Sequence, residues 1–117
     1  MIDDKAQELG RLIGQTEEYK ALRRASERLR EDSECQAQLA AVEKLAGEIE
    51  AGARQGQEPS PEQTQQYDQA VQSIQVNPVY QQMAAAQANF EKLMAKVNAR
   101  IYEGIQKGAA SPIITLG

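Results

Sequence analysis

Apolar residues along this chain recur every three or four positions, which is the spacing of one face of an α-helix. The first stripe consists of Ile2, Ala6, Leu9 and Ile13. Gly14 follows it as a candidate left-handed helix stop. Thr16 has the chemistry of an N-cap, and carboxylates follow it in the next turn, where they suit the positive end of a helix. The pattern therefore predicts two short helices, over residues 3–15 and 17–31.

A third stripe alternates at spacings of four and three residues. Its members are Cys35, Leu39, Val42, Ala46, Ile49 and Ala53. This alternation is typical of a helix that packs lengthwise against another helix. Asp32 or Ser33 could cap the third helix, although one continuous helix with a shifted apolar face also fits the pattern. Pro59 and Pro61, together with nearby glycines, end it.

Proline-containing signals start the last two helices. Residues 60–63, Ser-Pro-Glu-Gln, form a capping-box variant that predicts a helix running to about Val76. The dipeptide Asn77-Pro78 again combines a capping residue with a proline in the first helical turn, so a break or a kink is expected there. Gly108 is expected to end the final helix. The seam of that helix, apolar except at Gln87, is the longest in the chain: Tyr80, Met83, Gln87, Phe90, Met94, Val97 and Ile101.

The helix lengths predict an elongated, all-α fold. At about 1.5 Å per residue, the third and fifth helices span roughly 35 and 45 Å, more than a compact domain of this mass requires. We expect an elongated antiparallel helical hairpin or bundle of about five helices. In this arrangement the third and fifth helices pair, the fourth lies between them, and the first two cover one end. Residues 1–107 would form the helical domain, and residues 108–117 a flexible apolar tail.

The seam between the long helices can close within one chain or between two copies, and the pattern leaves this open. The large side chains are few, with one Phe and no Trp, so the core is thin. Elongated helices that dimerise need less apolar volume per residue than a globule does, which favours a dimer. The seam residues expected in the core or at the dimer contact are Leu39, Val42, Ile49, Phe90, Met94, Val97 and Ile101.

Composition excludes several classes of function. The net charge of -4 argues against a protein whose main role is to bind the phosphate backbone of nucleic acids, since that affinity comes from clustered Lys and Arg. The chain has no His, and it carries no P-loop, dinucleotide turn or nucleophile elbow. We therefore expect no enzymatic activity, no catalytic residues and no metal ligands. No apolar run approaches the ~20 residues of a membrane span and no signal peptide is evident, so a cytoplasmic location is expected.

The second helix offers a candidate partner-binding face with a basic character. Glutamates are interleaved with its arginines within reach of i, i+4 pairing, so a solvated, mutually screened surface is favoured over a nucleic-acid site. The residues expected to meet a protein partner are Tyr19, Leu22, Arg23, Arg24 and Arg28. The lone Cys35 lies in phase with an apolar seam, and is interpreted as a small buried hydrophobe in preference to a ligand or redox group.

Several segments together resemble the YlbF/YmcA family of bacterial regulators. The opening passage LGRLIGQTEEYKAL, residues 9–22, leads into an amphipathic helix with an acidic break at Asp32. The Gln- and Gly-rich turn over residues 52–61, Asn77-Pro78 at a helix start, and the apolar spacing of residues 90–105 also fit. The resemblance covers about residues 2–105, and it rests on helix punctuation and core positions.

This resemblance implies an all-helical, dimerising protein that takes part in bacterial control of competence, biofilm formation and sporulation. Members of the family act in complexes with one another and with a further partner, and are tied to mRNA processing through an endoribonuclease. Some members bind iron-sulfur clusters through cysteines. Four thiolates are the usual ligand set of a [4Fe-4S] cluster, and this chain has Cys35 alone, so no cofactor is expected.

The last residues suggest a second hypothesis. Ile113, Ile114 and Leu116 form an apolar set that can dock on another protein, or can fray or fold back over the chain's own core, which is the favoured interpretation. The first hypothesis is a helical adaptor that binds itself, related regulators or an endoribonuclease complex. The alternative is a structural or cargo-like dimer that docks to a larger assembly through this tail.

Overall fold

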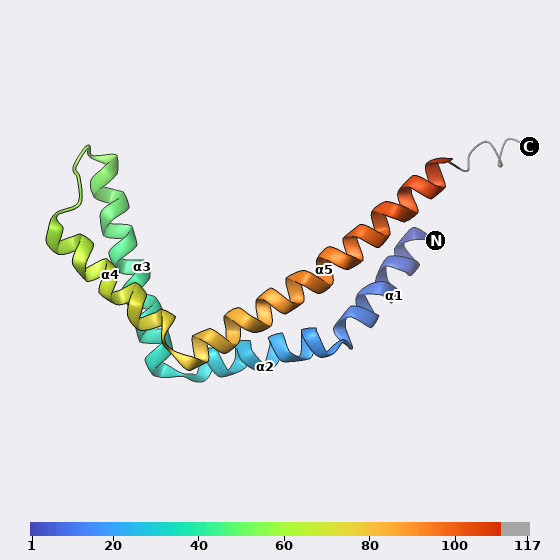
Figure 1. The fold of residues 1–117 in the computed structure, drawn as a ribbon, viewed down its shortest axis with the longest axis horizontal. Helices are drawn as coiled ribbons and strands as arrows, with labels where there is room; N and C mark the ends of the chain where they lie inside the picture. The colour runs from blue at the N-terminus through green and yellow to red at the C-terminus, as the bar shows by residue number, and fades with distance from the viewer. Residues whose placement is uncertain (111–117) are drawn as a thin grey trace, which may run out of the picture.

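A computed structural model describes residues 1–110, which fold into five α-helices and contain no strand (Figure 1). The helices are α1 (Ile2–Gly14), α2 (Glu17–Glu31), α3 (Ser33–Arg54), α4 (Pro61–Gln75) and α5 (Pro78–Ala110). The all-α, elongated architecture is therefore confirmed. None of these helices is both long enough and apolar enough to cross a membrane.

Side-chain caps begin four of the helices where the sequence predicts them. The backbone N–H of Tyr19 donates to Thr16 Oγ1 over 3.2 Å at the start of α2. The N–H of Cys35 donates to Asp32 Oδ1 over 2.8 Å at the start of α3. A reciprocal capping box starts α4 and an Asn cap starts α5. Each such cap contributes about 1 kcal/mol, so short polar side chains fix where these helices begin.

Helix α1 ends at Gly14 as predicted, but Gly14 is not left-handed, and the predicted stop at Gly108 is wrong. The one glycine with a positive φ in residues 1–110 is Gly56, at +77°, in the turn after α3. At the end of α1, Thr16 Oγ1 donates a hydrogen bond to the carbonyl of Ile13 over 2.6 Å. This bond satisfies one of the last carbonyls of the helix, so a left-handed glycine is not needed there. Gly108 lies inside α5, which continues to Ala110, because an exposed helix end tolerates a glycine without losing its backbone hydrogen bonds.

The pairing of the helices also differs from the prediction. The long α5 packs against α2, and α3 packs against α4, so α3 and α5 do not form the expected hairpin (Figure 1). The reason is that the chain breaks twice at the same level, once between α2 and α3 and once between α4 and α5. The chain changes direction at both breaks, between α2 and α3 and between α4 and α5, so the molecule has two arms. We call α1, α2 and α5 the long arm, and α3 and α4 the hairpin arm.

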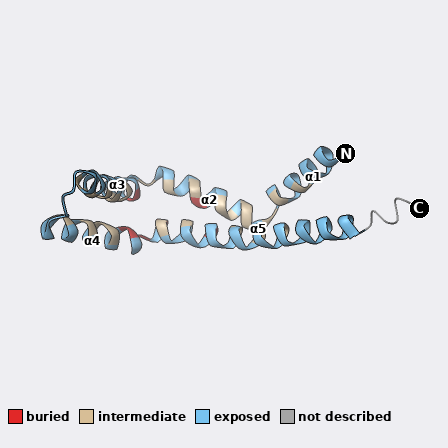
Figure 2. Cartoon of the chain, turned by 90° about the horizontal axis from the view of Figure 1, so that it is seen from above, coloured by how far each residue is buried: buried red, intermediate tan, exposed pale blue. Residues whose placement is uncertain are grey.

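The core lies at the junction of the two arms, which we call the elbow. Cys35, Ile74 and Val79 are buried there. Half-buried side chains surround them: Leu29, Leu39, Val42 and Tyr80. The seam predicted for α3 therefore closes within the chain at Leu39 and Val42. In Figure 2 the buried positions gather mainly near this junction, and most of the two arms is exposed.

Polar side chains fix the bend. Asn77 is buried, and its Oδ1 accepts from the N–H of Val79 over 2.9 Å while its Nδ2 donates to Gln38 Oε1 over 2.9 Å. Gln36 Nε2 donates to the carbonyl of Leu29 across one break. Gln81 Nε2 donates to a carbonyl of α4 across the other. The elbow is thus a hydrogen-bonded joint in which helix ends are satisfied despite the interruption.

The dimensions of the molecule are those of an extended body. It measures 72 × 36 × 19 Å, with a radius of gyration of 21.9 Å, whereas a compact domain of this length has about 13 Å. Its accessible surface is 9161 Å², against roughly 6,300 Å² for a compact monomer of this mass. A large part of its apolar surface consequently stays in contact with water.

Candidate partner-binding surface

Tyr19, which the sequence assigned to a partner, lies in the contact between α2 and α5. The Tyr19 ring lies 5.7 Å from the Phe90 ring, centroid to centroid, and is tilted by 56°. Such tilted aromatic pairs contribute about 0.5–1.5 kcal/mol beyond their burial. Leu22, one turn further along α2, is half-buried. Tyr19 therefore joins two helices of the same chain.

The arginines of α2 differ in their surroundings. Arg23 lies 3.8 Å from Glu27 in an exposed i, i+4 pair, which contributes little to stability. Arg28 Nη1 donates to Gln82 Oε1 over 2.7 Å and so links α2 to α5. Arg24 is exposed and has no ion-pair partner among residues 1–110. Of the three, Arg24 has the charge that is most available to a partner.

The seam of α5 closes within the chain along only part of its length. Phe90, Met94 and Val97 are half-buried, as is Ile49 on α3. Ile101 is 45 % exposed, and every residue of α5 from 98 onwards is exposed. The last turns of α5 therefore extend beyond the helices that cover it. The predicted tail contacts, Ile113, Ile114 and Leu116, lie outside the residues that the structure describes.

An apolar patch lies at the free end of the long arm. Tyr102 and Ile105 are each 60 % exposed on α5, and Ile2 and Leu12 are exposed on α1. A shallow hollow of about 380 Å³ lies beside them, with Leu9, Val97 and Ile101 as its apolar lining and Lys96 and Arg100 as its charged lining. Sequence reasoning took α1 for a cover over one end and missed this patch. The stripe of apolar residues on α1 was the available signal.

Two further hollows lie along the line where α2 meets α5. One of about 430 Å³ is lined by Ala21, Arg24, Ala25, Arg28, Gln82 and Ala86. The other, of about 440 Å³, is lined by Glu17, Glu18, Ala21, Asn89, Lys92, Leu93 and Lys96. Ala21 belongs to both, and Lys96 also lines the hollow at Leu9. Because neighbouring hollows share a lining residue, we group the three together as the long-arm groove.

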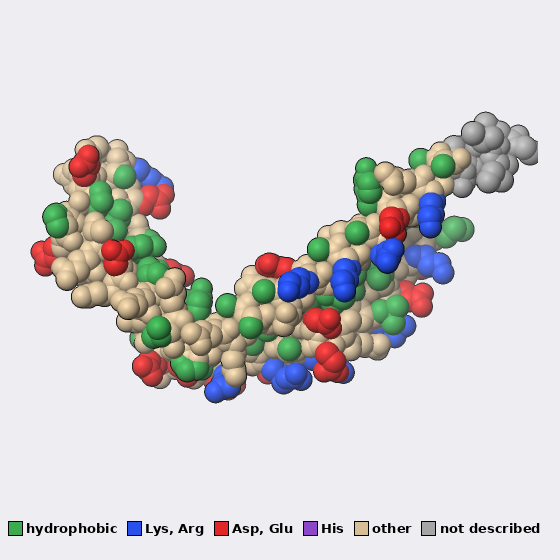
Figure 3. Space-filling model, viewed as in Figure 1, with side chains coloured by type: hydrophobic (Ala, Val, Ile, Leu, Met, Phe, Trp, Pro, Cys, Tyr) green, Lys and Arg blue, Asp and Glu red, His purple; other side chains and the backbone are tan. Residues whose placement is uncertain are grey.

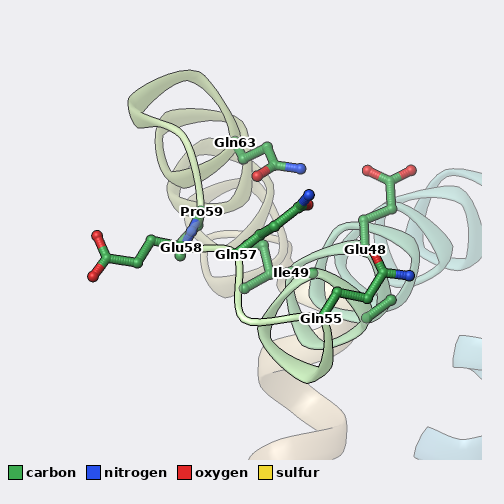
Figure 4. Close-up of a pocket in the computed structure, with 9 residues that line it drawn as sticks. Glu48, Ile49, Gln55, Gln57, Glu58, Pro59 and Gln63 are labelled. Atoms are coloured by element: carbon green, nitrogen blue, oxygen red, sulfur yellow. The ribbon is translucent and has the colours of Figure 1, made fainter.

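A separate hollow of about 290 Å³ lies at the tip of the hairpin arm (Figure 4). Its lining is rich in Gln and Glu. The carboxylates of Glu48 and Glu58 point away from each other, on opposite sides of the hollow. Catalysis by paired carboxylates requires both groups to face one reacting bond. The geometry at this tip therefore does not form an acid–base pair.

The thiol of Cys35 is fully buried at the elbow. Burial raises the pKa of this thiol above its ordinary value of 9.0, and the nearby Asp32 and Glu34 carboxylates raise it further. A thiol in such surroundings stays protonated, whereas metal binding and nucleophilic attack require the thiolate. Within the described part of the chain, no three His, Cys, Asp or Glu side chains gather in a metal-binding arrangement.

Known proteins give two points of comparison. Residues 2–106 match the family described as control of competence regulator ComK, YlbF/YmcA. The crystal structure of Bacillus subtilis RicA in complex with RicF contains a chain of similar fold, with a TM-score of 0.81. The alignment covers 92% of this chain and 96% of that one at 18% sequence identity, a level at which the likeness shows the fold. No curated protein matches the sequence significantly.

Proposed function

The chain belongs to the YlbF/YmcA family of competence regulators, and from this premise we propose that it is a non-enzymatic adaptor that works by protein–protein contact. Its partners are a second copy of itself and related helical regulators, and the resulting complex modulates mRNA processing by an endoribonuclease. It acts stoichiometrically, because it changes the activity of a partner by occupying a surface. It needs no cofactor for this role and functions in the cytoplasm.

The observation that carries this proposal is the apolar surface that the long arm leaves uncovered. Ile101, Tyr102 and Ile105 form part of it on α5. Surfaces of this kind, when they are contiguous and edged by charge, mark protein interfaces. The structural relative was crystallised with another protein, RicF, which supports a protein partner for this chain.

The mechanism follows from shape. A bent scaffold about 72 Å long can contact two bodies at once, one on each arm. Such a scaffold raises the effective concentration of one bound protein near the other, and it does so without any chemistry of its own. The capped, hydrogen-bonded elbow would hold the two sites at a set angle.

Affinity purification of the tagged protein from its native cytosol, kept anaerobic, tests the proposal. Mass spectrometry and light scattering of the eluate then give the identity and stoichiometry of what is bound. We expect a stoichiometric complex with a second copy or with a family relative, and a sub-stoichiometric endoribonuclease. A monomer without any stoichiometric partner would contradict the adaptor role. An iron-bearing, coloured preparation would contradict the absence of a cofactor.

A further inference from the structure

The long-arm groove has an apolar floor and a basic edge. Its floor contains small or apolar residues from both helices, among them Ala21, Ala25, Ala86 and Leu93. On α5 the lining runs from Gln82 to Ile101, which corresponds to about 29 Å of helix. This length and the small residues suit another helix laid along the groove, since small residues allow two helix backbones to approach closely.

The charges along this groove are unbalanced. Its lining contains five cations and two carboxylates, so its net charge is +3. Lys92 and Lys96 have no ion-pair partner among residues 1–110, and neither has Arg24. Figure 3 shows Lys and Arg side chains in a row along α5. The partner that fits this groove is therefore acidic.

The hairpin arm of the same chain has the complementary charge. Residues 32–76 include eight Asp or Glu and two Lys or Arg, a net charge of -6, whereas residues 1–31 and 77–110 together carry +2. Most charged side chains over the hairpin arm in Figure 3 are Asp and Glu, on the face that also shows the basic row. Helix α3 spans 22 residues, about 33 Å, and so matches the groove in length.

The outer surface of α3 also fits the apolar floor of the groove. Glu34, Ala37 and Ala41 are exposed and line one shallow hollow of this arm, and Glu48 lies further along the helix. This row has small residues in its middle, carboxylates at its ends and one cation, the exposed Lys44, between Ala41 and Glu48. It can lie against a floor of alanines while its carboxylates reach the cations at the edge.

We propose that the long-arm groove is the docking surface for the acidic hairpin arm of a second copy of this chain. A twofold axis along the bisector of the two arms places the hairpin arm of each copy on the long arm of the other. Both contacts then pair opposite charges, whereas equivalent arms side by side would place two hairpins of -6 together. This inference rests on the proposed function, for which it specifies the surface and the orientation of self-association.

The available area agrees with such a dimer. The exposed surface exceeds that of a compact monomer by roughly 2,900 Å². A stable interface of standard size buries about 1,200–2,000 Å² in total. Burial of part of each long arm and each hairpin arm supplies this amount without any change of fold.

A charge swap tests the proposal. The groove variant is Lys92→Glu with Lys96→Glu. Two hairpin variants reverse two carboxylates each, Glu34→Lys with Glu48→Lys on α3, and Glu62→Lys with Asp68→Lys on α4. All of these side chains are exposed, so the fold is retained, which circular dichroism checks. Sedimentation velocity then gives the dimer dissociation constant of each protein, alone and in mixtures, at low and high salt.

We expect the groove variant and at least one hairpin variant to dimerise about 10-fold to 100-fold more weakly than the original chain. A mixture of those two variants should form a heterodimer within about 3-fold of the original affinity, because the swap makes both contacts attractive again. The control, Lys20→Glu with Arg30→Glu on α2, makes the same change in net charge at exposed positions outside the groove lining and should leave the dissociation constant within about 2-fold.

Three results would overturn the inference. The first is a groove variant that dimerises as tightly as the original chain, and the second is a mixture that stays monomeric with both hairpin variants. In these two cases the dimer forms elsewhere and the adaptor role stands. The third is a monomer at every concentration in low salt, which removes the self-docking, while the affinity purification decides separately whether related proteins bind.

Discussion

At the residue scale, buried polar groups at the elbow determine where the chain bends. Asn77 is the one buried polar or charged residue in residues 1–110, and all of its bonds serve the joint. A buried amide that lost its partners would cost free energy, because it could not return to water. The sequence marked Asn77 as a helix start, but its second bond, to Gln38, joins residues 39 positions apart and could not be predicted.

The first prediction concerns this bond. Asn77→Ala removes both the cap of α5 and the link to α3, and we expect it to lower the free energy of unfolding by about 2 kcal/mol. Gln38→Ala removes the link and keeps the cap, and should cost less than about 1 kcal/mol. Urea denaturation measures both. Equal losses in the two variants would show that the cap contributes nothing.

A second prediction at this scale concerns Cys35. Its pKa is raised in the folded state, so the unfolded thiol ionises at a lower pH than the folded one. The buried, protonated thiol therefore makes its full contribution to stability at a pH below its ordinary pKa of 9.0. This contribution is lost as the pH rises through the folded pKa. Urea denaturation from pH 7.5 to 10.5 should show a steeper loss of stability for the original chain than for Cys35→Ala. Parallel pH profiles would contradict the burial of this thiol.

At the element scale, the helix starts were predictable because each depends on a few neighbouring residues. Thr16, Ser60 and Asn77 cap helices where the pattern placed them, and α3 is capped by Asp32, one of the two residues that the pattern allowed. Helix ends were predicted less well. The ends of α1 and α5 depend on a hydrogen bond from Thr16 and on solvent exposure at residue 108, and neither follows from the presence of a glycine.

Two glycines provide a matched pair for the third prediction. Gly56 has a φ of +77°, so Gly56→Ala should lower the free energy of unfolding by about 1 kcal/mol. Gly47 lies in the middle of α3 with open space around a would-be side chain, and Gly47→Ala should raise stability by about 0.5–1 kcal/mol. Thermal unfolding followed by circular dichroism measures both. Changes of the same sign would contradict the described α3–α4 turn.

A fourth prediction separates the covered part of α5 from its protruding part. Phe90→Asp places a charge against Tyr19 and should destabilise the fold by at least about 2 kcal/mol. Ile101→Asp lies where the helix is uncovered, so it should change stability by less than about 1 kcal/mol. The same substitution should weaken association, which light scattering detects. Equal destabilisation by both substitutions would mean that the end of α5 is packed within the chain.

At the scale of the whole molecule, the sequence predicted an elongated helical protein of this family but gave the wrong helix pairs. The apolar stripes show which face of a helix is buried, yet several partners can satisfy the same stripe. The pairing is decided by two chain breaks, at Asp32 and Asn77, which lie next to each other in the folded molecule. Their proximity arises only when the chain has folded, so it cannot be seen in the sequence. The uncovered end of the long arm follows from the same bend.

Hydrogen exchange of the backbone amides tests the central claim that the long arm is the binding surface. The protein would be measured alone at low concentration and in its purified complex. Residues 98–110 form helix without covering side chains, so they should exchange fast when alone. We expect the complex to slow exchange over residues 92–105 of α5. Protection confined to α3 and α4, or no protection at all, would contradict the account.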